Sequence, residues 1–271
     1  MRILFIGDIF GRPGRQKVQE WLPDYRERRG VDFVAANAEN SAGGKGINAE
    51  IAEEFFESGI DALTGGNHSF QYRDSYPLFE RDERVLRPAN LPPGTPGRGL
   101  GIYQLAHGPC VAVANLQGRA FMKPVDCPFR AAERLLEEAQ AATPIVIIDF
   151  HAEASSEKVA MAAHVDGRAT AVIGTHTHVP TADARVSPAG TAAITDVGMT
   201  GPCDSVIGVR TDIILEQLIV GMPVRHEVGE GPARVCALEM DVDESDGRAQ
   251  SVRLVQDPDW PRRRGQQAKS R

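Results

Sequence analysis

Short apolar runs that each end in polar residues recur along this chain, and they restrict its fold more than any other feature. The first three are Arg2–Gly7, Val31–Ala38 and Ile60–Thr64, and a segment of helical periodicity follows each of the first two. Apolar runs of this length predict strands that are buried on both faces, as in a parallel sheet covered by helices. We therefore predict an α/β fold in which right-handed crossovers bring the carboxyl ends of these strands to one edge.

The later part of the chain adds further strands, helices and hairpins. We predict buried strands over Pro144–Phe150 and Ala169–Ile173, helices over Ser155–Val165 and Asp212–Val220, and hairpins formed by Leu100–Ala106 with Cys110–Leu116, Arg185–Ser187 with Ala192–Thr195, and Cys236–Val242 with Ser251–Val255. We also predict a turn over Gly11–Gly14 and helix caps at Asn48 and Asp126. Because the sequence has no repeat of fixed period and no clear linker, we predict a single domain over residues 1–257, followed by a basic, flexible tail over residues 258–271.

The composition argues against several classes of partner. The 271 residues carry a formal net charge of −7, so we expect no stable nucleic-acid partner and no attraction to anionic membranes. No stretch approaches the ~18 uninterrupted apolar residues that a membrane-spanning helix needs. The four cysteines lack C-x-x-C spacing, and the first apolar run is too short for a signal peptide. We therefore expect a cytoplasmic protein with reduced thiols, and the composition leaves a homo-oligomer open.

Polar residues that can bind metal ions follow the predicted strands. They are Asp8, Glu39, Asn40, Asn67, His68, His151, His176 and His178. Ligand sites of α/β sheets lie at the carboxyl edge of the strands, so we expect these side chains to meet. Carboxylate, amide and imidazole ligands suit Zn, Mn or Fe. The set exceeds the needs of one tetrahedral ion and suits two ions ~3.5–4 Å apart that share a bridging carboxylate.

The stretch from Gly174 to His178 contains two of these candidate ligands. In an extended chain His176 and His178, two positions apart, project on the same side and reach one metal or two adjacent metals. A polar loop that holds two histidines by chance is the alternative. Each other candidate has an ordinary alternative too, such as a helix cap for Asp8, a loop ion pair for Glu39 or a core histidine for His151. Their occurrence at successive strand ends favours a common site.

The order of these motifs resembles that of the calcineurin-like metallophosphoesterase superfamily, and more closely that of its YmdB branch. The supporting stretches are Gly7–Gly14, Asn37–Asn40, Gly66–His68, Asp149–Glu153, Gly174–His178 and Thr195–Gly201. Each stretch alone is a weak signal, but jointly they are specific and cover most of the chain. The resemblance implies a four-layer α/β/β/α sandwich that hydrolyses small phosphodiesters, including 2′,3′-cyclic nucleotides, with two iron ions; Mn and Zn are the alternatives.

The resemblance also implies a role for each candidate residue. Asp8, Glu39, Asn40 and His178 would hold the first metal, while Glu39 would bridge to a second metal that Asn67, His151 and His176 complete. His68 would be the general acid. Phe10 stands where the broader superfamily has a histidine, Glu39 replaces a bridging aspartate, and Ser69 replaces a common acidic residue. These departures favour the YmdB branch over the generic enzyme.

Two functional alternatives stay open at the level of sequence. A phosphomonoesterase or nucleotidase would use the same dinuclear site, because two metal ions catalyse both reactions by activating water and neutralising phosphate charge. A non-catalytic metal-binding regulator would be favoured by an incomplete ligand set, and this set is nearly complete. A serine hydrolase is disfavoured because the chain contains no G-x-S-x-G motif.

Overall fold

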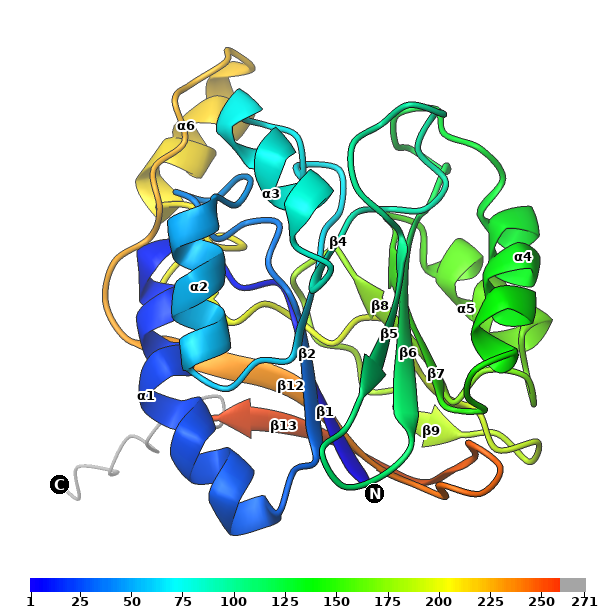
Figure 1. Ribbon diagram of the computed structural model, residues 1–271. Coiled ribbons are helices and arrows are strands. Elements are labelled where there is room, and N and C mark those ends of the chain that lie inside the picture. Colours follow the sequence, from blue (N-terminus) through cyan, green and yellow to red (C-terminus); the bar gives the residue numbers. More distant parts are fainter. Residues whose placement is uncertain (259–271) are drawn as a thin grey trace, which may run out of the picture.

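The computed structural model describes residues 1–258 and contains two β-sheets with helices outside them (Figure 1). The strands are β1 (Arg2–Ile6), β2 (Phe33–Asn37), β3 (Ala62–Thr64), β4 (Val85–Leu86), β5 (Leu100–Gln104), β6 (Cys110–Gln117), β7 (Val146–His151), β8 (Ala171–Thr175), β9 (Arg185–Val186), β10 (Ala192–Ile194), β11 (Gly201–Pro202), β12 (Ala233–Val242) and β13 (Ala249–Asp257). The helices are α1 (Gly11–Arg29), α2 (Ala49–Glu57), the 3-10 helix η1 (Arg73–Ser75), α3 (Tyr76–Arg81), α4 (Pro128–Gln140), α5 (Ser155–His164) and α6 (Thr211–Val220). Apart from Pro258, the predicted tail lies outside the described residues.

Each sheet has a parallel centre and antiparallel strands at its margin. In the first sheet the strand order is β11-β12-β1-β2-β3-β4, with β13 also paired to β12, and β1 to β4 are parallel. In the second sheet the order is β5-β6-β7-β8-β10-β9, and its four inner strands are parallel. The predicted hairpins over β5–β6, β9–β10 and β12–β13 are confirmed.

Alternation along the strands divides the interior into three apolar layers. In β1, Ile3 and Phe5 face the second sheet, whereas Leu4 and Ile6 face the outer helices. This period of two is what a strand buried on both faces requires. The layer between the sheets joins residues of β1, β2 and β12 to residues of β6, β7 and β8.

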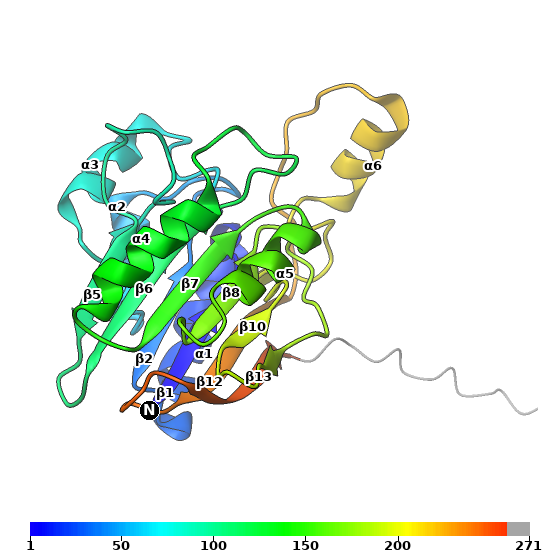
Figure 2. The same ribbon diagram turned by 90° about the vertical axis from the view of Figure 1, so that its right-hand side faces the viewer.

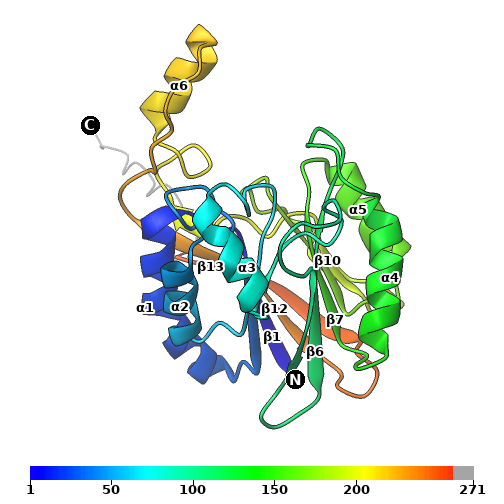
Figure 3. The ribbon, with the colours of Figure 1, turned by 45° about the horizontal axis from the view of Figure 1, so that its top comes forward.

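The outer layers complete a four-layer arrangement. Helices α1 and α2 cover the first sheet, and α4 and α5 cover the second (Figures 1 and 3). Helix α1 ends at Gly30, which adopts a left-handed backbone with φ of 61°. Helix α2 begins after Asn48, whose side chain accepts a hydrogen bond from Ile51 N. The predicted α/β/β/α sandwich is therefore confirmed.

Two local predictions are wrong. Gly11–Gly14 forms the first turn of α1 rather than a separate turn, because Pro13 near the amino end of a helix needs no N–H partner. The residue that precedes α4 is Cys127, and its helix has no side-chain cap, so Asp126 does not serve as one. The short elements β4, β11, η1 and α3 were not predicted, because two- to six-residue segments carry little periodic signal.

Helix α6 stands apart from the rest of the molecule (Figures 1 and 3). None of its residues is buried, and Leu218 and Ile219 are 74% and 81% exposed. Only its first turn packs on the body, where Ile213 and Ile214 contact a small apolar cluster that includes Phe10. In residues 1–258, no helix is both long and apolar enough to cross a membrane.

Candidate metal centre

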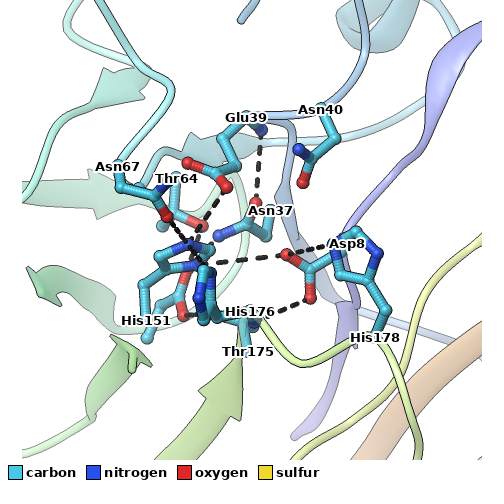
Figure 4. Close-up of polar contacts among 12 residues, drawn as sticks. Asp8, Asn37, Glu39, Asn40, Thr64, Asn67, His151, Thr175, His176 and His178 are labelled. Atoms are coloured by element: carbon cyan, nitrogen blue, oxygen red, sulfur yellow. Dashed lines mark hydrogen bonds and ion pairs between the residues drawn. The ribbon is translucent and has the colours of Figure 1, made fainter. Parts of the chain in front are cut away.

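The predicted site residues gather where the carboxyl ends of the two sheets meet (Figure 4). The first sheet supplies Asp8 after β1, Glu39 and Asn40 after β2, and Asn67 and His68 after β3; the second supplies His151 at the end of β7 and His176 and His178 after β8. Glu39, His151 and His176 place their ligand atoms within 4.8 Å of one another.

His151 lies at the centre of these ligand atoms. Its Nε2 is 3.0 Å from Glu39 Oε1, 2.9 Å from Asn67 Oδ1 and 3.0 Å from His176 Nδ1. A Cβ atom at Gly66 would lie 2.3 Å from Glu39 Oε2 and 2.5 Å from His151 Nε2, so a side chain there would obstruct this approach. Glycine thus lets the loop after β3 reach the carboxyl end of β7.

The outer nitrogen of His151 belongs to a buried hydrogen-bond chain. Thr175 Oγ1 donates to Asp149 Oδ1 at 2.7 Å and therefore accepts from His151 Nδ1 at 2.9 Å. This order places a hydrogen on Nδ1 and directs Nε2 into the site. Asp149 also accepts a hydrogen bond from Asn37 Nδ2 at 2.8 Å, and Asn37 Oδ1 accepts from the Glu39 backbone N–H at 3.2 Å. One buried carboxylate therefore supports residues from both sheets.

The other two histidines are oriented in the same way by different partners. His176 Nε2 lies 3.0 Å from Glu153 Oε2, which leaves Nδ1 to face His151. His178 Nδ1 lies 2.9 Å from the carbonyl oxygen of Ile207, which leaves Nε2 facing Asp8 Oδ1 at 3.9 Å. Outer hydrogen bonds to carboxylate or carbonyl oxygen are typical of metal-binding histidines, because they fix the tautomer and the ring orientation.

The two histidines after β8 do not reach the site in the predicted way. The strand ends at Thr175, and both His176 and His178 adopt positive φ, 98° and 66°. Each such non-glycine conformation costs of order 1–3 kcal/mol. Thr177, which lies between them, is fixed by Asp196, whose Oδ2 accepts from Thr177 N at 3.0 Å and from Lys158 Nζ at 2.8 Å. The rings consequently separate, one toward His151 and the other beside Asp8 (Figure 4).

The candidate ligand atoms include more hydrogen-bond acceptors than the neighbouring hydrogens can satisfy, and metal ions would satisfy them better. The single hydrogen that His151 Nε2 can carry faces three acceptors, on Glu39, Asn67 and His176. Asp8 Oδ1 and Asn40 Oδ1 are buried and have no hydrogen-bond donor within residues 1–258. Buried acceptors without a donor are costly, and a metal ion is what would satisfy such a group of oxygen and nitrogen atoms.

The pKa values reflect the same concentration of acceptors. Burial raises the pKa of Asp8 to about 6, although the neighbouring histidines lower it. Burial alone would raise the pKa of Glu39 and lower that of His151, but their mutual attraction prevails: the pKa of Glu39 falls to about 2 and that of His151 rises to about 9. Burial and the charge of His151 lower the pKa of His176 to about 3. In the absence of a metal ion, a proton on His151 thus supplies the positive charge that the site attracts.

His68 lies beside this group rather than within it. Its backbone N–H donates to Glu39 Oε2 at 2.8 Å, while its half-buried ring has no hydrogen-bond partner in the part of the chain described. Burial lowers the pKa of His68, and Glu39 opposes that effect. Ser69, which replaces an acidic residue of the broader superfamily, does not orient His68; its hydroxyl bonds to Gly66 N and Gly66 O and closes the turn.

Phe10, which replaces a histidine of the broader superfamily, supports a candidate ligand. Its ring meets His178 edge to face, with centroids 5.6 Å apart and planes at 76°. The contact helps to hold the orientation that the Ile207 carbonyl selects. Sequence reasoning missed the supporting groups Asp149, Thr175, Glu153, Ile207, Asp196 and Lys158. For the first three, a signal existed in their closeness to predicted ligands, whereas the last three depend on contacts between distant segments.

All four cysteines lie among the described residues, and all are free. None belongs to the group of ligand atoms described above. The candidate ligand atoms of this group are therefore oxygen and nitrogen.

Comparison with known proteins finds relatives over most of the chain. Residues 4–255 match the family described as YmdB-like protein. The chain is 45% identical to the Bacillus subtilis protein named 2′,3′-cyclic-nucleotide 2′-phosphodiesterase, over 94% of this chain and 96% of that protein. It also superposes on a hypothetical protein from Thermus thermophilus, with a TM-score of 0.89, 43% identity, and coverage of 94% of this chain and 98% of the other. A structure described as a novel phosphatase from Mycoplasma pneumoniae gives a TM-score of 0.89 at 30% identity, with 94% and 92% of the two chains covered. The match over residues 4–255, together with these relatives, shows that the chain belongs to the YmdB-like family.

Proposed function

We propose that this protein is a metal-dependent phosphodiesterase that hydrolyses 2′,3′-cyclic nucleotides at a dinuclear centre. The observation that carries the proposal is the orientation of three imidazoles, each with its outer nitrogen bonded to an oxygen and its inner nitrogen directed into the group of candidate ligand atoms. The name of the Bacillus subtilis relative supports the choice of substrate.

We assign the candidate ligands to two metal ions. Asp8, Glu39, Asn40 and His178 would hold the first metal, and Glu39, Asn67, His151 and His176 the second. The unpartnered oxygens of Asp8 and Asn40 support the first group, and the mutual approach of Glu39, His151 and His176 supports the second. When bound, two such ions supply an activated water and positive charge for the phosphate oxygens. We propose iron, because of the family resemblance, with manganese and zinc as alternatives.

His68 is the proposed general acid. Its ring lies beside the ligand atoms without a hydrogen-bond partner in residues 1–258, so it is available to a substrate. A ribose oxygen leaves as a strongly basic alkoxide and needs a proton, whereas a nitrophenolate needs little help, and a general acid contributes ~10²–10⁴-fold. A general acid acts in its protonated form, so hydrolysis of cyclic nucleotides should decline as pH rises through the pKa of His68. Burial lowers that pKa.

The test compares two substrates and two variants. His68→Ala should lose far more activity on 2′,3′-cyclic AMP than on bis-nitrophenyl phosphate, with the metal content unchanged. The exposed His107 provides a matched control, since His107→Ala should change neither activity. Equal losses on both substrates with metals retained would exclude His68 as the acid, and a fall in metal content would make it a ligand.

A phosphomonoesterase or nucleotidase remains the alternative activity. The same donor set would serve it, so only a panel of phosphomonoesters and phosphodiesters separates the two. Higher kcat/KM on 5′-AMP than on 2′,3′-cyclic AMP would favour the alternative. A regulator that binds metal without catalysis would hydrolyse neither.

We further propose that residues 1–257 form one domain in a cytoplasmic protein without a stable nucleic-acid partner. The apolar layer shared by both sheets supports the single domain. The free cysteines support the cytoplasmic location, and the net charge of −7 argues against a stable nucleic-acid partner.

The exposed apolar residues of α6 support a homo-oligomer. Light scattering of the wild type and of Leu218→Glu would test this, because the substitution should reduce the mass only if α6 forms the contact.

A further inference from the structure

A basic cavity lies outside the metal centre, beside helix α4. It has a volume of about 360 Å³ and is lined by Arg87, Arg98 and Arg134 together with Gly99, Leu135 and Glu138, among others. We call it the arginine pocket. Figure 2 shows α4, which supplies one wall, lying across β5 and β6. Three guanidinium groups and one carboxylate share this space, and none of these residues belongs to the metal centre.

Arg87 is the least satisfied of the three arginines. It follows β4 and is half-buried, and its Nη1 donates to the carbonyl oxygen of Pro88, at 2.8 Å. Its Nε is buried without a partner, and no carboxylate in residues 1–258 lies within ion-pair distance of it. Burial lowers the pKa of Arg87, which indicates that the cation is poorly solvated. A half-buried guanidinium whose Nε is shielded from water and has no anion beside it is unfavourable, so this position favours a ligand of opposite charge.

The neighbouring arginines add charge without neutralising Arg87. Arg98 is bound through its carbonyl oxygen to Arg87 N at 2.9 Å, which keeps the two residues together. Among the described residues, the Arg98 guanidinium pairs only with Glu83, at 2.8 Å, and both side chains are exposed. Arg134 donates to the carbonyl oxygen of Arg130 and has no ion pair among the described residues. By contrast, Arg168 elsewhere on the surface holds Glu133 through two hydrogen bonds of 2.7 and 3.0 Å.

We propose that the arginine pocket binds a phosphate group, either free or carried by a nucleotide. Guanidinium groups present paired N–H donors that match the oxygens of a phosphate, and several of them around one cavity favour a multivalent anion. A phosphate carries more charge and more acceptor oxygens than a carboxylate, so it can bind more of these guanidinium groups at once. The site does not depend on the proposed enzymatic activity.

Calorimetric titration of the metal-loaded protein with inorganic phosphate at low ionic strength tests the proposal. Phosphate also binds dinuclear centres, so the wild type should show a site that depends on Arg87 in addition to any metal site. Arg87→Met should lose that site and retain the other. Arg130→Met removes an exposed arginine of α4 that does not line the pocket, and it should behave as the wild type. Identical titrations of wild type and Arg87→Met would overturn the proposal.

A second variant guards against a folding defect. Arg134→Met, on the outer helix, should weaken the same site about tenfold or more, because one charge-assisted hydrogen bond is lost. Repeating the titration with 5′-AMP identifies the source of the phosphate: a tighter Arg87-dependent site for AMP indicates a nucleotide, and a tighter one for inorganic phosphate indicates the free ion. Binding of both ligands that is unaffected by either substitution would contradict the assignment.

Discussion

Thr175→Val is the most informative single change, because it removes one oxygen and keeps the shape of the side chain. The hydroxyl connects His151 Nδ1, at 2.9 Å, to Asp149 Oδ1, at 2.7 Å, and all three residues are fully buried. Without it, the hydrogen on Nδ1 has no acceptor and that carboxylate oxygen has no donor. His151 then loses the constraint that directs Nε2 toward Glu39 and Asn67.

The expected magnitude follows from these lost contacts. Loss of an outer hydrogen bond to a metal-binding histidine typically weakens metal binding by about 10–100-fold. Each buried group left without a partner also costs about 1–3 kcal/mol of the free energy of unfolding. Thr191→Val is the matched control, because the Thr191 hydroxyl is equally buried and bonds to Gly167 N and Ala169 O, away from the metal centre.

The assay is competition for metal between each variant and a chromophoric chelator, with urea unfolding measured in parallel. Both variants should lose stability, and only Thr175→Val should lose metal affinity. Unchanged metal affinity in Thr175→Val, or an equal loss in Thr191→Val, would refute the role assigned to the hydrogen-bond chain from Asp149 to His151.

Three further predictions concern other charged groups. Glu39→Gln should reduce metal loading more than Asn40→Ala, because a bridging carboxylate supplies charge to both ions; equal loading by elemental analysis would remove Glu39 from the bridging role. Lys158→Met should destabilise the fold by about 3–5 kcal/mol in urea unfolding, since Asp196 would stay buried without its cation, and a loss under about 1 kcal/mol would count against this ion pair. Burial would raise the pKa of Glu239, but hydrogen bonds from its arginine and tyrosine partners lower it to about 2. Its folded pKa thus lies below the unfolded value, so it stabilises the protein above about pH 4.5, and this contribution is lost as pH falls toward 2; Glu239→Gln should flatten the decline in stability between about pH 5 and pH 3.

Sequence reasoning predicts the sheets well because their strands are buried on both faces. A short apolar run such as the one that forms β7 predicts a buried strand, and polar residues mark where each strand ends. The same logic predicts which side chains gather at the carboxyl edge. Local signals were less reliable at helix starts: Asn48 caps α2 as predicted, whereas Asp126 does not cap α4. Capping depends on one hydrogen bond, which neighbouring residues readily replace.

The geometry of the site exceeds what a sequence pattern contains. Spacing suggested that His176 and His178 extend side by side, but the chain leaves β8 with two left-handed residues. That backbone is held by Asp196, which is 19 residues from Thr177, and Lys158, which pairs with it from α5. The acceptor of the His178 hydrogen bond is the main-chain carbonyl of Ile207. Every residue has such a carbonyl, so the residue type does not predict this partner. Supporting contacts of this kind require the folded chain.

The most direct test of the central claim is the number of metal ions that each chain holds. Elemental analysis of protein purified without oxygen, and again after reconstitution with iron, manganese or zinc, measures it. The converging donors of Asp8, Glu39, Asn40, Asn67, His151, His176 and His178 predict two ions per chain, with Glu39→Gln falling below that value. At most one ion per chain after reconstitution of the wild type would contradict the dinuclear centre and the mechanism that depends on it.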